Sequence, residues 1–183
     1  MWYRSAGPGY QLTMSVAKVG ISRKARQEAQ AYAGDEERPL GDYLTLVAGY
    51  GVSVAVLTAL ARRFGRHLPE RPALSDLVLL SVATHKLSRR LAKDPVTSPL
   101  RAPFTRFSGR SGEAEVAEEV RGTGPRKAVG ELVTCPFCLG QWVVTALGFG
   151  LVFAPRPTRF ACGLLSALTV SDFLQLAYDK AQP

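Results

Sequence analysis

The sequence predicts an all-α fold: a small polytopic membrane bundle of about four hydrophobic helices, with short cytoplasmic helices beside it. Two long runs, residues 43–61 and 132–155, contain no Asp, Glu, Lys or Arg. A third run, residues 160–178, contains a single such residue, Asp172. A helix needs about 20 apolar residues to cross a hydrocarbon core of about 30 Å, and each run approaches or exceeds that length. Soluble helices normally keep a polar face, which these runs lack, so the pattern favours membrane insertion.

A fourth segment, residues 74–92, is less apolar and is predicted to be short or partly re-entrant. Asp76 lies near its start, whereas His85, Lys86 and Arg89 lie near its end. Cationic side chains at a helix end can reach the lipid headgroups from a short span. A helix that lies in the membrane surface fits the same pattern. We favour a span, because an even number of crossings gives the clearer charge asymmetry.

The distribution of cations predicts that both chain ends are cytoplasmic. With four spans, 17 of the 23 Lys and Arg residues fall in the N-terminal segment, the loop after the second span and the tail. Cytoplasmic loops carry an excess of Lys and Arg, so this asymmetry places these three segments on the cytoplasmic side of the membrane. Four arginines within residues 62–71 oppose the assignment, because they follow the first span.

Composition divides the chain into three parts. Residues 1–40 form a polar, basic arm, which is predicted to be helical over residues 14–33. Residues 41–178 form the membrane helical domain, with a cytoplasmic loop at residues 92–130. Residues 179–183 form a short tail.

The cytoplasmic loop is predicted to contain two short helices. Prolines interrupt the helix that precedes the loop, and Asp94 is expected in a turn or a cap. Ser98 is expected to cap a helix over residues 99–107, with Pro99 at its first position. Residues 113–120 are rich in glutamate and are predicted to form a second, acidic helix.

Cys135 and Cys138, separated by two residues, leave three interpretations open. They can supply half of a tetrahedral zinc site. They can form a redox dithiol, since a helix start stabilises a thiolate. They can also form a structural turn at the membrane boundary, with small polarizable side chains. Cys162 is not expected to be a third ligand, because an intervening helix places it about 30 Å from Cys135. We therefore predict no cofactor, with zinc as the alternative.

Three further residues stand out near the predicted spans. Gly140 permits close approach of a neighbouring backbone. Trp142 suits the interfacial belt of a membrane protein. Asp172 lies within the last span, where a carboxylate needs a partner, and a basic residue such as His85 or Lys86 is expected to supply it. A proton or ion path through Asp172 is the alternative.

Three short motifs together resemble one bacterial membrane family. They read His85-Lys-Leu-Ser-Arg89, Asp94-Pro-Val-x-x-Pro99-Leu-Arg101 and Glu131-Leu-x-x-Cys135-Pro-Phe-Cys138-x-Gly140-x-Trp142. The family is known as domain of unknown function 1360, and the resemblance covers residues 41–178. It implies a small multi-span membrane protein without an established activity, so it supports the topology and supplies no mechanism.

We predict a non-enzymatic integral membrane protein that acts as a scaffold or binds a partner through its cytoplasmic loop. The alternatives are a thiol oxidoreductase or zinc-binding protein that uses Cys135 and Cys138, and an ion or proton carrier that uses Asp172. The net charge of +8 does not predict nucleic-acid binding, because acidic residues are mixed with the cations and no stacking aromatics accompany them. The expected partners are membrane lipids, with other membrane or cytoplasmic proteins or a second copy as further possibilities.

Overall fold

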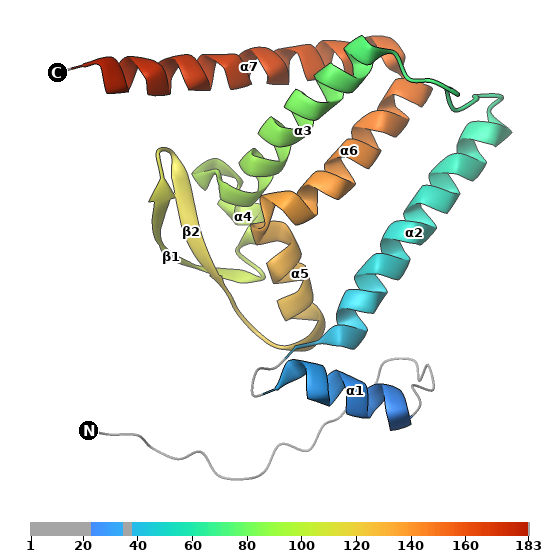
Figure 1. Cartoon of the computed structure of the whole chain (residues 1–183), viewed down its shortest axis with the longest axis vertical. Helices are drawn as coiled ribbons and strands as arrows, with labels where there is room; N and C mark the ends of the chain where they lie inside the picture. Colours follow the sequence, from blue (N-terminus) through green and yellow to red (C-terminus); the bar gives the residue numbers. More distant parts are fainter. Residues whose placement is uncertain (1–22, 35–37, 183) are drawn as a thin grey trace. The chain divides into compact units, whose positions relative to one another are not determined.

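The computed structural model describes residues 23–34 and 38–182, which divide into two units at Arg38 and Pro39 (Figure 1). Helix α1 (Arg23–Ala33) belongs to the first unit. It ends at Gly34, which has a φ of +56° and donates its N–H to the Gln30 carbonyl at 3.2 Å. Glycine favours this left-handed conformation, so the predicted helix end is confirmed. Residues 14–22 of the expected helix lie outside the described residues.

Four long helices dominate the second unit. They are α2 (Leu40–Arg63), α3 (Leu74–Lys93), α6 (Pro136–Phe153) and α7 (Pro155–Ala181). Among the described helices, α2, α6 and α7 are long and apolar enough to cross a membrane. As predicted, the runs of residues 43–61 and 160–178 lie within α2 and α7, and α6 forms the middle of the run of residues 132–155. Helix α3 is long enough but carries too many charged residues to be apolar throughout.

Helix α2 runs in the same direction as the segment formed by α5 (Gly124–Thr134) and α6. Near the start of α2, the Tyr43 hydroxyl donates a hydrogen bond to the Glu131 carboxylate on α5. Two turns further along α2, the Tyr50 hydroxyl lies 2.8 Å from Thr145 Oγ1 on α6. The later residue of α2 therefore contacts the later residue of the α5–α6 segment, which shows that α2 and α6 run in the same direction.

Helix α3 packs against α6 and α7, and in Figure 1 α6 lies between α3 and α2. The Arg159 guanidinium at the start of α7 donates to the Asp76 carboxylate at the start of α3, at 2.8 Å. Further along both helices, the Lys86 ammonium pairs with the Asp172 carboxylate. Helices α3 and α7 therefore run in the same sense, although their axes diverge toward the C-terminus in Figure 1. Since one short turn at Ala154 joins α6 to α7, the direction of α6 is opposite to theirs.

A compact group of short elements follows α3, and we call residues 94–134 the head. Its first part is a 3-10 helix, η1 (Pro95–Thr97), followed by α4 (Ser98–Arg101). Strands β1 (Thr105–Gly112) and β2 (Glu115–Val120) form an antiparallel hairpin, and α5 completes the head. In Figure 1 the head lies beside the end of α3 and the start of α6.

The hairpin corrects the all-α prediction. The helices expected over residues 99–107 and 113–120 are wrong, because α4 stops at Arg101 and both stretches enter strands. Along β2, Val116 and Glu118 lie two residues apart and both side chains are buried. This two-residue period belongs to a strand. In the sequence, residues 113–120 resemble an exposed acidic helix because a glutamate, Glu118, occupies an inward position of the strand.

The long helices bury few residues against one another. Ala61 is the one buried residue of α2, and large apolar side chains such as Leu44, Val47 and Val52 are mostly exposed. Helix α7 exposes Phe160 in the same way. Soluble proteins rarely expose contiguous apolar surface on this scale, whereas lipid-facing helices do so.

Candidate functional site

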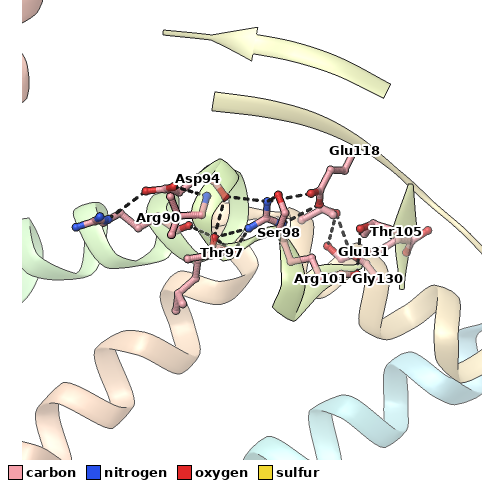
Figure 2. A network of polar contacts seen from close by, with 12 residues as sticks. Arg90, Asp94, Thr97, Ser98, Arg101, Thr105, Glu118, Gly130 and Glu131 are labelled. Atoms are coloured by element: carbon pink, nitrogen blue, oxygen red, sulfur yellow. Dashed lines mark hydrogen bonds and ion pairs between the residues drawn. The ribbon is translucent and has the colours of Figure 1, made fainter. Parts of the chain in front are cut away.

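The head is organised around the Arg101 side chain at the end of α4 (Figure 2). This side chain is 1% exposed, although arginine is almost never fully buried unless it is paired. Its counterion is Glu118 of β2, whose side chain is 5% exposed. Arg101 Nε donates to Glu118 Oε2 at 2.7 Å and Nη2 donates to Oε1 at 3.0 Å. This two-point contact fixes the orientation of both groups.

The remaining donors of Arg101 hold the chain that leads into α4. Nη1 donates to the Leu91 carbonyl at 2.7 Å and to Thr97 Oγ1 at 2.6 Å. Nη2 donates to the Asp94 carbonyl at 3.1 Å and to Ser98 Oγ at 3.2 Å. One guanidinium therefore joins the end of α3, η1, α4 and β2.

The same contacts hold Glu118 in its charged form. Burial raises the pKa of this carboxyl, but the hydrogen bonds and the positive charge of Arg101 outweigh burial. Hydrogen bonds from Ser98 and Thr105 act in the same direction, so the pKa lies below the ordinary value of 4.5. The pair is therefore an ion pair at neutral pH.

Asp94 forms the turn between α3 and η1, as predicted. Its Oδ1 accepts a hydrogen bond from the Val96 N–H at 2.8 Å, which caps η1, and its Oδ2 lies 3.3 Å from Arg90 Nε. Ser98 does not cap α4, contrary to the prediction; its hydroxyl accepts a hydrogen bond from Arg101. Pro99 lies in the first turn of α4 and is exposed.

Helix α5 closes the head from the other side through Gly130. A Cβ at this position would lie 2.6 Å from Val120 Cγ1 and 3.1 Å from the Phe104 carbonyl oxygen, so the contact requires glycine. The neighbouring Glu131 faces α2, where it accepts the hydrogen bond of Tyr43. Glu131 therefore links the head to the first long helix.

The tip of the hairpin is fastened to α3. Arg89 Nε and Nη2 donate to the two carboxylate oxygens of Glu115 at 2.9 and 2.8 Å. Glu115 is the first residue of β2, directly after the tip, and Arg89 lies one turn beyond Lys86 on α3. The hairpin therefore folds back alongside α3 toward the Lys86–Asp172 pair.

The first part of the head presents apolar side chains on its surface. Val96 of η1 is 83% exposed and Leu100 of α4 is 67% exposed. Both belong to turns that the Arg101 contacts hold in place. The head thus combines a charged, hydrogen-bonded interior with two exposed apolar side chains on its first turns.

Cys135 and Cys138 lie at the junction of α5 and α6. Cys135 is the N-cap of α6, and its Sγ accepts a hydrogen bond from the Cys138 N–H at 3.3 Å. Cys162 is buried near the start of α7, at the opposite end of α6. Within residues 23–34 and 38–182, no group of three His, Cys, Asp or Glu side chains is placed to hold a metal ion.

The structure places the other predicted residues in different settings. Lys86 is the partner of Asp172, whereas the neighbouring His85 is exposed. Trp142 packs edge-on against Tyr50, with ring centroids 5.2 Å apart. A Cβ at Gly140 would lie 3.9 Å from Thr84 Cγ2, an ordinary van der Waals distance, and the close backbone approach expected there stays a prediction.

Comparison with known proteins assigns the family. The model of a family described as protein of unknown function (DUF1360) matches residues 79–178. The chain belongs to this family. The matched range includes most of α3, the whole head, α6 and most of α7, and it leaves α2 outside. The resemblance inferred from the motifs is therefore confirmed, over a shorter stretch than residues 41–178.

Two relatives come from Bacillus subtilis (strain 168). The chain is 29% identical over 107 residues to sporulation protein YjcA, an alignment that covers 57% of this chain and 91% of YjcA. It is 24% identical over 109 residues to UPF0713 protein YngL, covering 56% of this chain and 80% of YngL. No solved structure matches the chain.

Two central residues of the head were missed in the sequence. Glu118 falls in the stretch predicted as an acidic helix, and the available signal for a strand was its two-residue spacing from Val116 and Val120. Gly130 lies inside a helix, where an isolated glycine is unfavourable and indicates a packing constraint. Arg101 was recognised through the family motif, but its counterion was not.

Proposed function

We propose that the protein is a non-enzymatic integral protein of the bacterial inner membrane that presents the head as a docking platform on the cytoplasmic side. In this proposal α2, α3, α6 and α7 each cross the bilayer. Both chain ends are then cytoplasmic.

The directions of the long helices support four crossings. Because α2 and α6 are parallel, the chain has to return across the bilayer between them, and α3 is the helix that does so. The charges of α3 do not oppose this role, since Asp76, Lys86 and Arg89 each have an oppositely charged partner on another element. The Lys86–Asp172 pair then lies near the cytoplasmic boundary, where long cationic side chains reach the headgroups.

The buried Arg101–Glu118 pair is the observation that carries the docking proposal. Burying two charges gives little net stability, and in some proteins such pairs serve to specify one conformation. Here the pair fixes the turn that exposes Val96 and Leu100. A rigid apolar surface at the far end of α3 is suited to a protein partner.

The alternative functions receive less support. Cys135 caps a helix through its sulfur, which favours the structural interpretation of the cysteine pair. The pairing of Asp172 with Lys86 favours a structural role for that carboxylate over an ion path. The YjcA relative carries sporulation in its name. We do not extend a specific cellular process from that name to this chain.

Site-specific photocrosslinking in bacterial cells tests the docking proposal. A photoreactive phenylalanine replaces Val96 or Leu100, and Leu74 at the other end of α3 is the control position because it is also highly exposed. We expect discrete protein adducts from Val96 and Leu100, and their loss when Glu118→Gln is added. Adducts to lipid alone from the two head positions, or the same protein adducts from Leu74, would contradict the proposal.

A further inference from the structure

We propose that the protein binds one anionic phospholipid of the outer leaflet, with an acyl chain between α2 and α6 and the phosphate at arginines that follow α2. This inference rests on the proposed four-crossing topology. It assigns a ligand to a surface far from the head.

A cleft that is largely open to the surroundings lies between the second half of α2 and α6. Its cavity volume is about 270 Å³, and its lining is mostly apolar, with two hydroxyl groups. The lining residues are Tyr50, Val54, Leu68, Thr145, Gly148 and Phe149. Gly148 leaves open space, since a Cβ there would have no neighbour within 4 Å. The cleft therefore extends from the middle of both helices to the connector after α2, where Leu68 lies.

The lining of the cleft indicates the occupant. Four of its six lining residues, Val54, Leu68, Gly148 and Phe149, have no polar side-chain group. A thin alkyl chain fits this apolar space, and at bilayer depth the surrounding solvent supplies such chains.

Unpaired arginines end α2 and occupy the connector that also carries Leu68 of the cleft lining. Residues 64–73 form the connector between α2 and α3, and they include Arg66 and Arg71; Arg62 and Arg63 end α2. In the part of the chain that the structure describes, these four side chains have no ion-pair partner. The one nearby acid, Glu70, leaves a local excess of positive charge.

The lipid accounts for the cations that oppose the predicted orientation. Lys and Arg are depleted in loops on the outer side, so four arginines beside one span need a reason to be there. A phosphodiester supplies the missing negative charge, and arginine is well matched to its oxygens. Leu68 connects the two features, because it belongs to the connector and also lines the cleft.

Lipid binding to the full chain in a neutral detergent tests the inference, with phosphatidylglycerol as the probe and native mass spectrometry as the readout. The double variant Arg66→Gln/Arg71→Gln removes headgroup contacts. Gly148→Leu fills the cleft, and Val54→Phe fills it from the opposite wall should the first variant fail to fold. The matched controls are Arg106→Gln/Arg110→Gln, two exposed arginines of β1, and Gly51→Leu on α2, which also faces open space.

We expect the headgroup variant to bind phosphatidylglycerol more weakly, by about fivefold for each arginine removed. The cleft variants lose affinity as well, and both controls stay within about twofold of the unaltered protein. Unchanged affinity in the headgroup variant overturns the inference. Full affinity in both cleft variants overturns the acyl-chain contact. Displacement of the lipid by inorganic phosphate alone identifies a free-anion site instead.

Membrane extraction separates failure of this inference from failure of the proposed function. If alkaline carbonate releases the unaltered protein from membranes, the topology itself is wrong. If the protein resists extraction but its lipid affinity is unchanged in all the variants, only the proposed lipid site is wrong.

Discussion

Glu118→Gln removes the counterion of the Arg101 guanidinium while keeping nearly the same side-chain shape. The guanidinium is 1% exposed, so water cannot replace the lost negative charge. Removing one partner of a buried ion pair typically costs about 3–5 kcal/mol. That is a large share of the roughly 5–15 kcal/mol that stabilises a whole domain. We therefore expect the hairpin to separate from α4 without unfolding of the long helices.

Hydrogen exchange measured by mass spectrometry resolves this local change. A loss of about 3 kcal/mol raises the population of the open head more than a hundredfold, and the amides of β1, β2 and α4 exchange faster by that factor. Amides of α6 keep their protection. Glu119→Gln is the matched control, because Glu119 is the next residue of β2 and is exposed; its effect stays within about 0.5 kcal/mol. Hairpin exchange that is equal in the two variants would refute the role given to the buried pair.

Three further predictions concern pH, packing and the second ion pair. Because the folded-state pKa of Glu118 is lowered, this carboxylate contributes its full stabilisation of the head above the ordinary pKa of 4.5. That stabilisation is lost as the pH falls through the folded-state pKa. Hydrogen exchange of the hairpin between pH 7 and pH 3 measures the loss, and the Glu118→Gln variant does not show this pH dependence. Gly130→Ala destabilises the protein by about 1–3 kcal/mol through overpacking, whereas Gly51→Ala, with open space around it, is neutral or stabilising in thermal unfolding. Lys86→Gln lowers the midpoint of thermal unfolding by about 2–4 °C, and the same substitution adds less when Asp172→Asn is already present; full additivity would show that the pair contributes nothing.

The three apolar helices were predictable because lipid solvation imposes a signal that is local in sequence. Charge-free runs marked α2 and α6, and a single-charge run marked α7. Helix α3 gave a weaker signal, since its tolerance for charge depends on distant residues. Asp76 is paired with Arg159, 83 positions away, and no local pattern reveals such a partner.

The head was harder to predict for a related reason. A glutamate in a short polar stretch indicates an exposed helix or loop unless its counterion is known. Glu118 points inward only because Arg101 is there to receive it, and the two residues lie on different elements. The motif that contains Arg101 identified the family, but a motif does not state which side chains meet.

Cysteine accessibility on the two sides of α3 tests the four-crossing topology most directly. In a background that carries Cys135→Ser and Cys138→Ser, a single cysteine is introduced as Glu70→Cys in the connector or as Ser111→Cys in the hairpin. The buried Cys162 provides a low background with an impermeant maleimide. The topology predicts that intact spheroplasts label only the connector cysteine and that inverted vesicles label only the hairpin cysteine. Labelling of both positions from the same side would show that α3 does not cross the membrane.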